Sequence, residues 1–192
     1  MADETANAQG TAGFLMEMGM LKRAKRSGWW IAGVKDPETI AEHSFRVGIV
    51  GAVLAMMEGA DPARVALMCL FHDTQETRVS DIPHIGRRYL EAASNEKVTA
   101  DQMSAAHPDV ASGVQRVVEE YENGTSLEVI VAHDADKLEC LIQAVEYREQ
   151  GCGNVQNWID TSRNSLKTAS AQALAEAALN MSSIEWQQTY LR

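Results

Sequence analysis

The feature that most constrains the fold is a series of helix-start signals, each set before a long apolar run. Asp36–Pro37 precedes a run that ends at Gly59, and Asp61–Pro62 repeats the same device. Aspartate is a favoured N-cap, and proline suits the first helical position because its missing N–H has no partner there. Thr125-x-x-Glu128 has the spacing of a capping box and opens a third run that closes at Gly151. We therefore expect three long helices.

The rest of the chain carries no competing strand signal. The sequence of 192 residues has only four prolines, and no stretch alternates apolar and polar residues in the manner of a strand. Helical patterns predict further helices over Thr11–Arg26, Asp109–Glu122, Val155–Leu166 and Ala171–Gln188. No repeat or shift in composition marks a second domain. We expect a flexible N-terminus over residues 1–10 and one compact all-α bundle over residues 11–192.

Charge and composition limit the partners and the compartment. A net charge of −10 argues against broad binding to nucleic-acid polymers or to membrane surfaces. The apolar stretches Val47–Met57 and Val65–Phe71 are well short of the ~20 residues needed to cross a membrane. Residues 1–10 lack the basic and apolar regions of a secretory signal, and the three cysteines form no Cys-x-x-Cys pair. We therefore expect a cytoplasmic protein.

Ionisable residues gather where one apolar helix should end. The stretch CLFHDTQETRVSD passes directly from apolar residues into His72 and Asp73, and Glu76 and Asp81 follow within eight residues. A solvated helix terminus or a metal site would explain this pattern. Neutral imidazole and carboxylate together suit divalent metals such as Mn, Fe, Co, Ni or Zn.

Two further candidate ligands, His43 and Asp136, lie on other predicted helices. At a rise of 1.5 Å per residue, His43 lies roughly 24 Å from the turn between the first two helices, and His72 roughly 15 Å. This mismatch of about 9 Å closes if the helices cross at an angle, or if the second continues past Asp73. Asp136 lies at the rim of an apolar stripe. A carboxylate is costly there without a partner, and a cation would be a suitable one.

Taken in order, these motifs resemble the HD superfamily of metal-dependent phosphohydrolases, and in particular its 5′-deoxynucleotidase group. The likeness covers nearly the whole chain and includes LKRAKRSGWW, DPETIAEHSFRV, HDTQETRVSDIP, VEEYE and DADKLECLIQAVEYREQG. The resemblance implies an HD-domain bundle, a homodimer, and an enzyme that uses one divalent metal ion (Co, Mn, Fe, Ni, Zn or Mg). Its substrate class would be deoxyribonucleoside 5′-monophosphates, from which it would release inorganic phosphate.

The resemblance also implies residue roles. It assigns the metal to His43, His72, Asp73 and Asp136. Glu76 would be the catalytic acid or base, and Asp81 would contact the deoxyribose. Arg26 would face the phosphate, and Trp29 would disfavour a 2′-hydroxyl. Ser80 departs from the family, which usually has glycine at this position, and the sugar preference can differ for that reason.

Elementary chemistry is consistent with these roles. A divalent ion lowers the pKa of its bound water and takes charge from a phosphoryl oxygen. Glu76 lies four residues after His72, so both side chains share a face if the helix continues, and the carboxyl group could orient water or protonate the leaving 5′-oxygen. The planar fork of Arg26 suits a phosphate. Lys137, next to Asp136, is a second candidate phosphate contact or a solvated lysine.

Three alternatives stay open. A dinuclear site, with His107 and His133 as extra ligands, would catalyse phosphodiester hydrolysis or iron-dependent oxygen chemistry. A phosphatase of the same type could act on a specialised phosphorylated metabolite. A non-enzymatic helical interaction protein with a vestigial site would lose neither metal nor activity when Asp73 is changed to alanine. A metal count for each chain separates the first alternative from a mononuclear enzyme.

Overall fold

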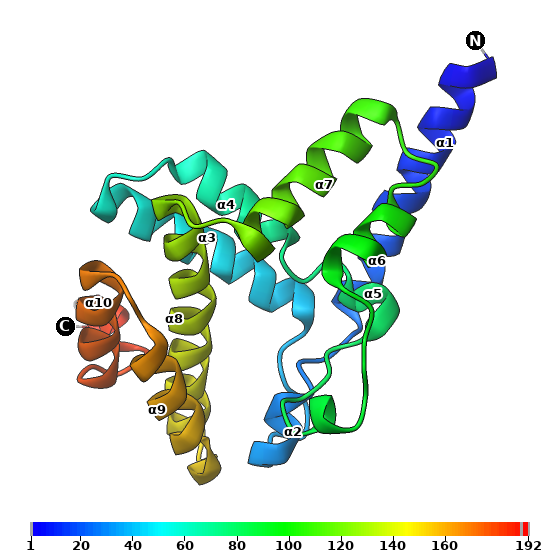
Figure 1. Ribbon diagram of the computed structural model, residues 1–192. Coiled ribbons are helices and arrows are strands. Elements are labelled where there is room, and N and C mark those ends of the chain that lie inside the picture. The colour runs from blue at the N-terminus through cyan, green and yellow to red at the C-terminus, as the bar shows by residue number, and fades with distance from the viewer. Residues whose placement is uncertain (1, 189, 192) are drawn as a thin grey trace.

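The computed structural model describes residues 2–188, 190 and 191, which form helices and loops without a strand (Figure 1). The expected all-α class is confirmed. The helices are α1 (Ala2–Glu17), α2 (Gly28–Ala32), α3 (Ile40–Glu58), α4 (Pro62–Phe71), α5 (Glu76–Val79), α6 (Asn95–Gln102), α7 (Pro108–Asn123), α8 (Leu127–Glu149), α9 (Gln156–Ser165), α10 (Ala169–Leu179) and α11 (Glu185–Gln188). Three short 3-10 helices lie at Met18–Lys22, Gly86–Arg88 and Gly153–Val155.

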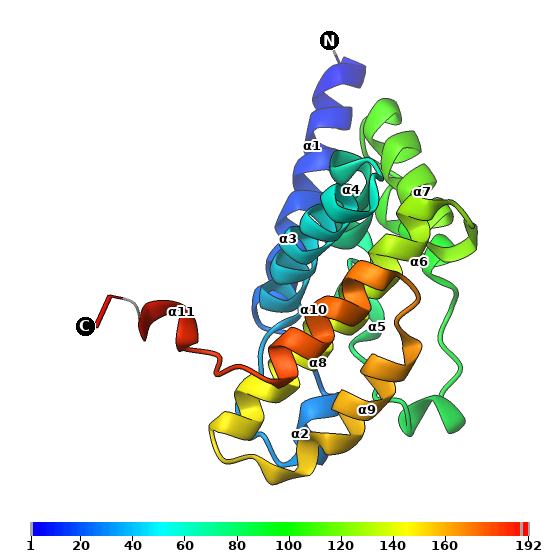
Figure 2. The same ribbon diagram turned by 90° about the vertical axis from the view of Figure 1, so that its left-hand side faces the viewer.

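Helices α3, α4 and α8 form the centre of the fold, and α9 and α10 pack along α8 (Figure 2). The main core includes Leu54 from α3, Met68 from α4 and Leu138 from α8, all of them almost fully buried. A smaller core cluster around Phe14 and Met103 joins α1 to α6 and α7. Burial of these apolar faces is the main favourable contribution to folding.

Among the described helices, α3 is the one whose length and composition would also suit a membrane span. It packs between α4 and α8 in the centre of the bundle, and 44% of its most apolar window is buried. This burial is typical of the core helix of a globular protein.

A glycine on α3 sets the crossing of α3 over α4. A Cβ added at Gly51 would lie 2.7 Å from the Sγ of Cys69 and 3.0 Å from a methyl carbon of Val65. Only glycine therefore allows the two helices to approach this closely without a shift. The ring centroids of His43 and His72 are 5.4 Å apart, so the mismatch of about 9 Å along the two helices does not keep these histidines from meeting.

One of the three predicted helix starts is confirmed. Asp61 caps α4, and its carboxylate accepts hydrogen bonds from the N–H groups of Ala63 and Arg64. The start of α3 differs, because Thr39 rather than Asp36 is its N-cap. The start of α8 is one residue later than predicted.

Local contacts explain the two differences. Asp36 pairs with the Nζ of Lys25 at 2.7 Å, which holds the segment before α3 outside the helix. Thr39 then forms a capping box with Glu42. At α8, the hydroxyl of Ser126 accepts the cap hydrogen bond in place of Thr125.

The first helix begins at Ala2 rather than at Thr11, so residues 2–10, which we expected to be flexible, are helical. A Cβ at Gly10 would lie 1.6 Å from the carbonyl oxygen of Ala105, which shows how closely α1 approaches the turn after α6. The hydroxyl of Thr11 accepts a hydrogen bond from the N–H of His107. Helices α2, α5 and α6 were not predicted, and the expected C-terminal helix is divided into α10 and α11.

Candidate metal centre and active site

Four side chains from α3, the end of α4 and α8 converge at the centre of the protein. The Oδ2 of Asp73 lies 3.1 Å from the Nε2 of His72 and 3.7 Å from the Nε2 of His43. The Oδ1 of Asp136 lies 3.3 Å and 3.9 Å from the same two nitrogens, in the order His43 and His72. The structure thus brings together all four residues to which the resemblance assigned the metal.

The separations fit the coordination shell of a first-row metal. Ligands about 2.1 Å from such an ion are about 3.0 to 3.4 Å apart in octahedral or tetrahedral geometry. The four distances given above span 3.1–3.9 Å. His43, His72 and Asp73 form the compact group, and Asp136 joins it through its contacts with the two histidines. Imidazole nitrogen and carboxylate oxygen form a donor set that divalent Mn, Fe, Co, Ni and Zn accept.

Hydrogen bonds at their other nitrogens orient the two histidines in the way that is usual for histidines that bind metal. The Nδ1 of His43 lies 2.5 Å from a carboxylate oxygen of Glu139, and the Nδ1 of His72 lies 2.7 Å from the carbonyl oxygen of Cys69. Each partner accepts a hydrogen bond from Nδ1–H, so in the neutral imidazole the free lone pair lies on Nε2. Both Nε2 atoms are buried without a hydrogen-bond partner. A buried polar atom without a partner is costly, and a metal ion would satisfy both.

The two aspartates are held ionised by cations at the rim of the cluster. The Nη1 of Arg26 lies 3.2 Å from the Oδ2 of Asp73, and the Nζ of Lys137 lies 2.6 Å from the Oδ2 of Asp136. Burial alone would raise the pKa of each carboxyl group. When no metal ion is bound and the histidines are protonated, His72 and then Arg26 outweigh burial at Asp73. Protonated His43 and then Lys137 do the same at Asp136, so both pKa values are lowered.

Behind His43 lies a buried network that the sequence reasoning missed. Glu139 is 0% exposed, and its Oε1 accepts a hydrogen bond of 2.8 Å from the Nε of Arg46. Arg46 also donates to Glu146 and Gln143. Burial would raise the pKa of Glu139, but the hydrogen bond from His43 and the charges of His43 and Arg46 lower it. Glu139 follows Asp136 by three residues on α8, and this helical spacing was the available signal.

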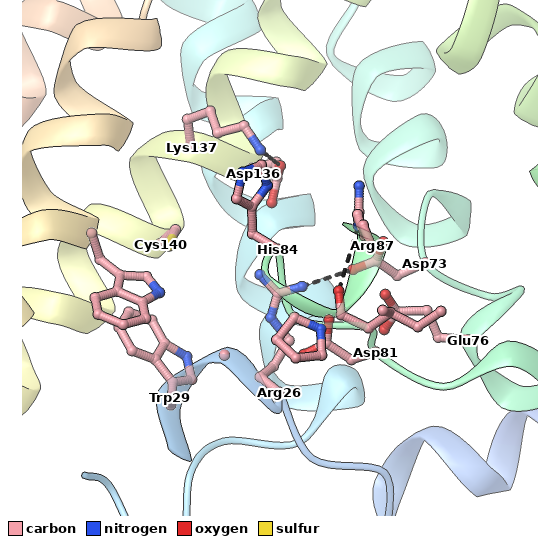
Figure 3. A pocket seen from close by; sticks show the side chains of 14 residues that line it. Arg26, Trp29, Asp73, Glu76, Asp81, His84, Arg87, Asp136, Lys137 and Cys140 are labelled. Carbon is pink, nitrogen blue, oxygen red and sulfur yellow. Dashed lines mark hydrogen bonds and ion pairs between the residues drawn. The ribbon is translucent and has the colours of Figure 1, made fainter. Parts of the chain in front are cut away.

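A cavity of about 310 Å³ opens beside the cluster, a volume at the lower end of the range for small-molecule sites (Figure 3). Its lining includes every residue that the resemblance assigned to substrate or catalysis: Arg26, Trp29, Glu76 and Asp81. It also includes Lys137, which the sequence offered as a second candidate phosphate contact. It also includes His84, Arg87, Cys140 and Trp158, which sequence reasoning did not assign to the site. These side chains reach the cavity through tertiary packing, and no local pattern marks them.

Glu76 stands out among the lining residues because its carboxyl group is partly buried and its pKa is raised. Its Oε2 is buried without a hydrogen-bond partner. Burial first, and then the charges of Asp73 and Asp81, raise the pKa of Glu76 to about 9. A carboxyl group that keeps its proton at neutral pH can donate it during a reaction.

The loop after α5 fixes Asp81 against the start of α2. The N–H of Ser27 donates to the Oδ2 of Asp81, and the hydroxyl of Ser27 donates to its carbonyl oxygen at 2.7 Å. Ser80, just before it, has a φ of 63° and a ψ of 162°. This conformation is essentially restricted to glycine. The family usually has glycine at this position, and here Ser80 adopts the backbone conformation that suits glycine.

Trp29 lies deeper than a direct substrate contact would require. It is 2% exposed, and its Nε1 donates a hydrogen bond of 3.0 Å to Glu38. Its ring stacks on Trp158 with centroids 5.6 Å apart and meets the edge of Tyr147 at 5.1 Å. Trp29 therefore forms the base of the cavity wall.

The two histidines of the dinuclear alternative lie outside the cluster. The Nδ1 of His107 accepts a hydrogen bond from the N–H of Asp109, and the Nε2 of His133 pairs with the carbonyl oxygen of Tyr121 at 3.0 Å. Neither belongs to the groups of metal-compatible side chains found among the described residues.

Comparison with known proteins places these observations in a family context. Residues 18–178 match the HD domain family. The 5′-deoxynucleotidase HDDC2 of Bos taurus is 30% identical over 153 residues, which cover 78% of this chain and 74% of that protein. The protein of the same name from Dictyostelium discoideum is 30% identical over 146 residues, which cover 71% of this chain and 77% of that protein.

A solved structure shares the fold over most of its length. A conserved hypothetical protein from Pyrococcus furiosus superimposes with a TM-score of 0.73 at 27% identity, and the match covers 89% of this chain and all of that one. The agreement in both sequence and fold extends across the helices that supply the clustered histidines and aspartates.

Proposed function

The chain belongs to the HD domain family, and from this premise we propose that it is a metal-dependent phosphohydrolase that releases inorganic phosphate from deoxyribonucleoside 5′-monophosphates. Its assignment as a hydrolase agrees with relatives that are named 5′-deoxynucleotidases. The observation that carries the proposal is the pair of buried, unpartnered Nε2 atoms of His43 and His72. They face two carboxylates beside a cavity that also holds cationic side chains and a glutamate whose pKa is raised.

The metal would be held by the four converging side chains, His43, His72, Asp73 and Asp136. When bound, a divalent ion supplies a water of lowered pKa and neutralises charge on a phosphoryl oxygen. Every remaining task falls to side chains of the cavity.

Arg26 and Lys137 supply the positive charge that a phosphate monoester needs. Each already pairs with one aspartate of the cluster, and both line the same cavity. A guanidinium group has five donors, and the bond from Arg26 to Asp73 leaves several of them for a phosphate. These contacts would hold the phosphoryl group and stabilise the charge that develops on it.

Glu76 is suited to protonate the leaving group. When the bond between phosphorus and the 5′-oxygen breaks, the electron pair stays on that oxygen, which needs a proton to depart as the nucleoside hydroxyl. The raised pKa of Glu76 supplies a carboxyl group that still holds its proton at neutral pH. A positioned acid of this kind contributes ~10²–10⁴-fold to the rate.

Asp81 would contact the sugar. Its Oδ2 accepts from the N–H of Ser27, which leaves Oδ1 as the atom for a deoxyribose hydroxyl. The preference for a deoxyribose over a ribose would depend on how closely the wall formed by Trp29 approaches the 2′-carbon. The predicted homodimer and cytoplasmic location stay predictions.

A phosphate-release screen tests this function. Purified protein, stripped with a chelator, is assayed with deoxy- and ribonucleoside 5′-monophosphates in the presence of Co, Mn, Mg, Ni or Zn, with Asp73→Ala as the matched control. We expect release from several deoxynucleotides, lower release from their ribose counterparts, and none from the control. Activity confined to another phosphorylated metabolite would change the substrate class. If no phosphate were released with any of the metals, the proposal would be wrong.

A further inference from the structure

The cavity has an aromatic end that the chemistry proposed above does not use. Trp158, on α9, lines the cavity together with Cys140 and Gly28. Figure 3 shows Trp29 and Cys140 on one side of Arg26 and Glu76 on the other, so this end lies away from the acid. No metal ligand, phosphate contact or proton donor is needed there.

Trp158 rests on a rigid support. Its ring stacks on the ring of Trp29, with an interplanar angle of 28°. Trp29 is held by its hydrogen bond to Glu38 and by the edge contact with Tyr147. One face of Trp158 is thus fixed against a buried partner, and the side chain keeps partial exposure towards the cavity. A preorganised aromatic surface of this kind binds a flat ring with little loss of side-chain entropy.

Three consecutive residues at the start of α2 connect the ring of Trp158 with the proposed phosphate and sugar contacts. Arg26 faces the cluster, Ser27 holds Asp81, and a Cβ at Gly28 would lie 3.7 Å from the Nε1 of Trp158. Consecutive residues therefore present a cation, a sugar contact and an aromatic ring. A nucleotide has the same order of phosphate, sugar and base.

We infer that Trp158 is the surface on which the nucleobase of the substrate stacks. This inference rests on the proposed function and extends it to how the base is recognised. The aromatic end of the cavity consists of Gly28, Trp29, Cys140 and Trp158, which offer few groups for hydrogen-bonded readout of a base. Stacking accepts every base because each has a π-face. Stacking on Trp158 would therefore add to the affinity for the nucleotide without selecting among the four bases.

Kinetics with a substrate that lacks the base tests the inference. The wild type and Trp158→Leu are compared on deoxyadenosine 5′-monophosphate and on 2-deoxyribose 5-phosphate. Stacking on an aromatic side chain accounts for a factor of about 5 to 150 in affinity for each base. We expect Trp158→Leu to raise KM for the nucleotide by a factor in this range with kcat retained, and to leave KM for the sugar phosphate unchanged.

Two further variants separate stacking from packing. Trp158→Phe keeps an aromatic face and should restore most of the nucleotide affinity. Trp30→Leu removes a neighbouring tryptophan that is 54% exposed and does not line the cavity. This variant should therefore leave KM and kcat unchanged for both substrates. Equal losses on both substrates in Trp158→Leu would assign Trp158 a merely structural role and overturn the inference. Unchanged kinetics on both would overturn it too.

A binding measurement on the intact protein covers the case in which Trp158→Leu does not fold. Deoxyadenosine monophosphate should quench the tryptophan emission of the wild type more than 2-deoxyribose 5-phosphate does, and this difference should disappear in Trp158→Phe. Equal quenching by the two ligands would overturn the inference. A wild type that hydrolyses neither substrate would instead remove the proposed function, so the two failures are distinguishable.

Discussion

Replacing Glu139 by glutamine tests whether the buried carboxylate behind His43 orients that histidine for metal binding. Glu139 accepts from His43 through one oxygen and from Arg46 through the other. Glutamine has nearly the same shape, but its amide nitrogen donates rather than accepts. In Glu139→Gln, either the Nδ1–H of His43 or the Nε–H of Arg46 therefore faces another donor.

Two effects of different size follow. Residues that orient a metal-binding histidine are typically worth ~10–100-fold in metal affinity, and we expect a loss in that range. Loss of one charge-assisted hydrogen bond in a buried site costs about 1.5–3 kcal/mol of the free energy of unfolding. The cost should stay below the ~3–5 kcal/mol of an isolated broken ion pair, because Arg46 keeps Glu146 and Gln143.

Competition between the protein and a metal-binding dye measures the first effect, and urea unfolding with chelator present measures the second. Glu146→Gln is the matched control, because Glu146 contacts Arg46 and its side chain is 29% exposed. The control should keep metal affinity within about 3-fold of wild type, since the mutated group does not touch a ligand. If Glu139→Gln binds metal like the wild type, packing alone orients His43 and the reasoning is wrong.

Three shorter predictions test other parts of the structure. Glu76→Gln should lower kcat by ~10²–10⁴-fold while metal content is retained, as assayed by steady-state kinetics and metal analysis; unchanged kcat would exclude Glu76 as the acid. Ser80→Gly should raise the free energy of unfolding by about 1 kcal/mol in urea titrations, because it relieves a backbone conformation that suits glycine, and a destabilised variant would contradict this. Glu17, whose pKa is lowered to about 2 mainly by its hydrogen bond from Arg78, contributes stability that is present above its unfolded pKa and is lost as the pH falls towards 2. Glu17→Gln should therefore unfold more easily than the wild type at pH 7, with a difference that vanishes near pH 2; a constant difference would refute this.

Local signals predicted those parts of the fold that depend on neighbouring residues. Asp61 caps α4 as expected, because its partners are the next two N–H groups. Asp36 does not cap α3, because Lys25 competes for its carboxylate from eleven residues earlier in the chain. The helical N-terminus was missed because its support comes from the turn after α6, near Ala105.

The site shows the same limit. The sequence indicated His43, His72, Asp73 and Asp136 as candidate ligands, and the family resemblance grouped them. The two histidines come together where α3 packs against α4, and this contact depends on tertiary packing rather than on a local pattern. Glu139 and Trp158 could not be assigned in this way, because their contacts with His43 and Trp29 join residues that are 96 and 129 positions apart in the sequence.

The central claim is that one divalent ion is held by side chains from three segments, and its most direct test is metal content. Wild type and Asp136→Ala are reconstituted with Co²⁺, desalted and analysed by mass spectrometry for metal per chain. We predict one cobalt per chain in the wild type and far less than one in the folded variant. Two metals per chain, none, or full retention in Asp136→Ala would contradict the account.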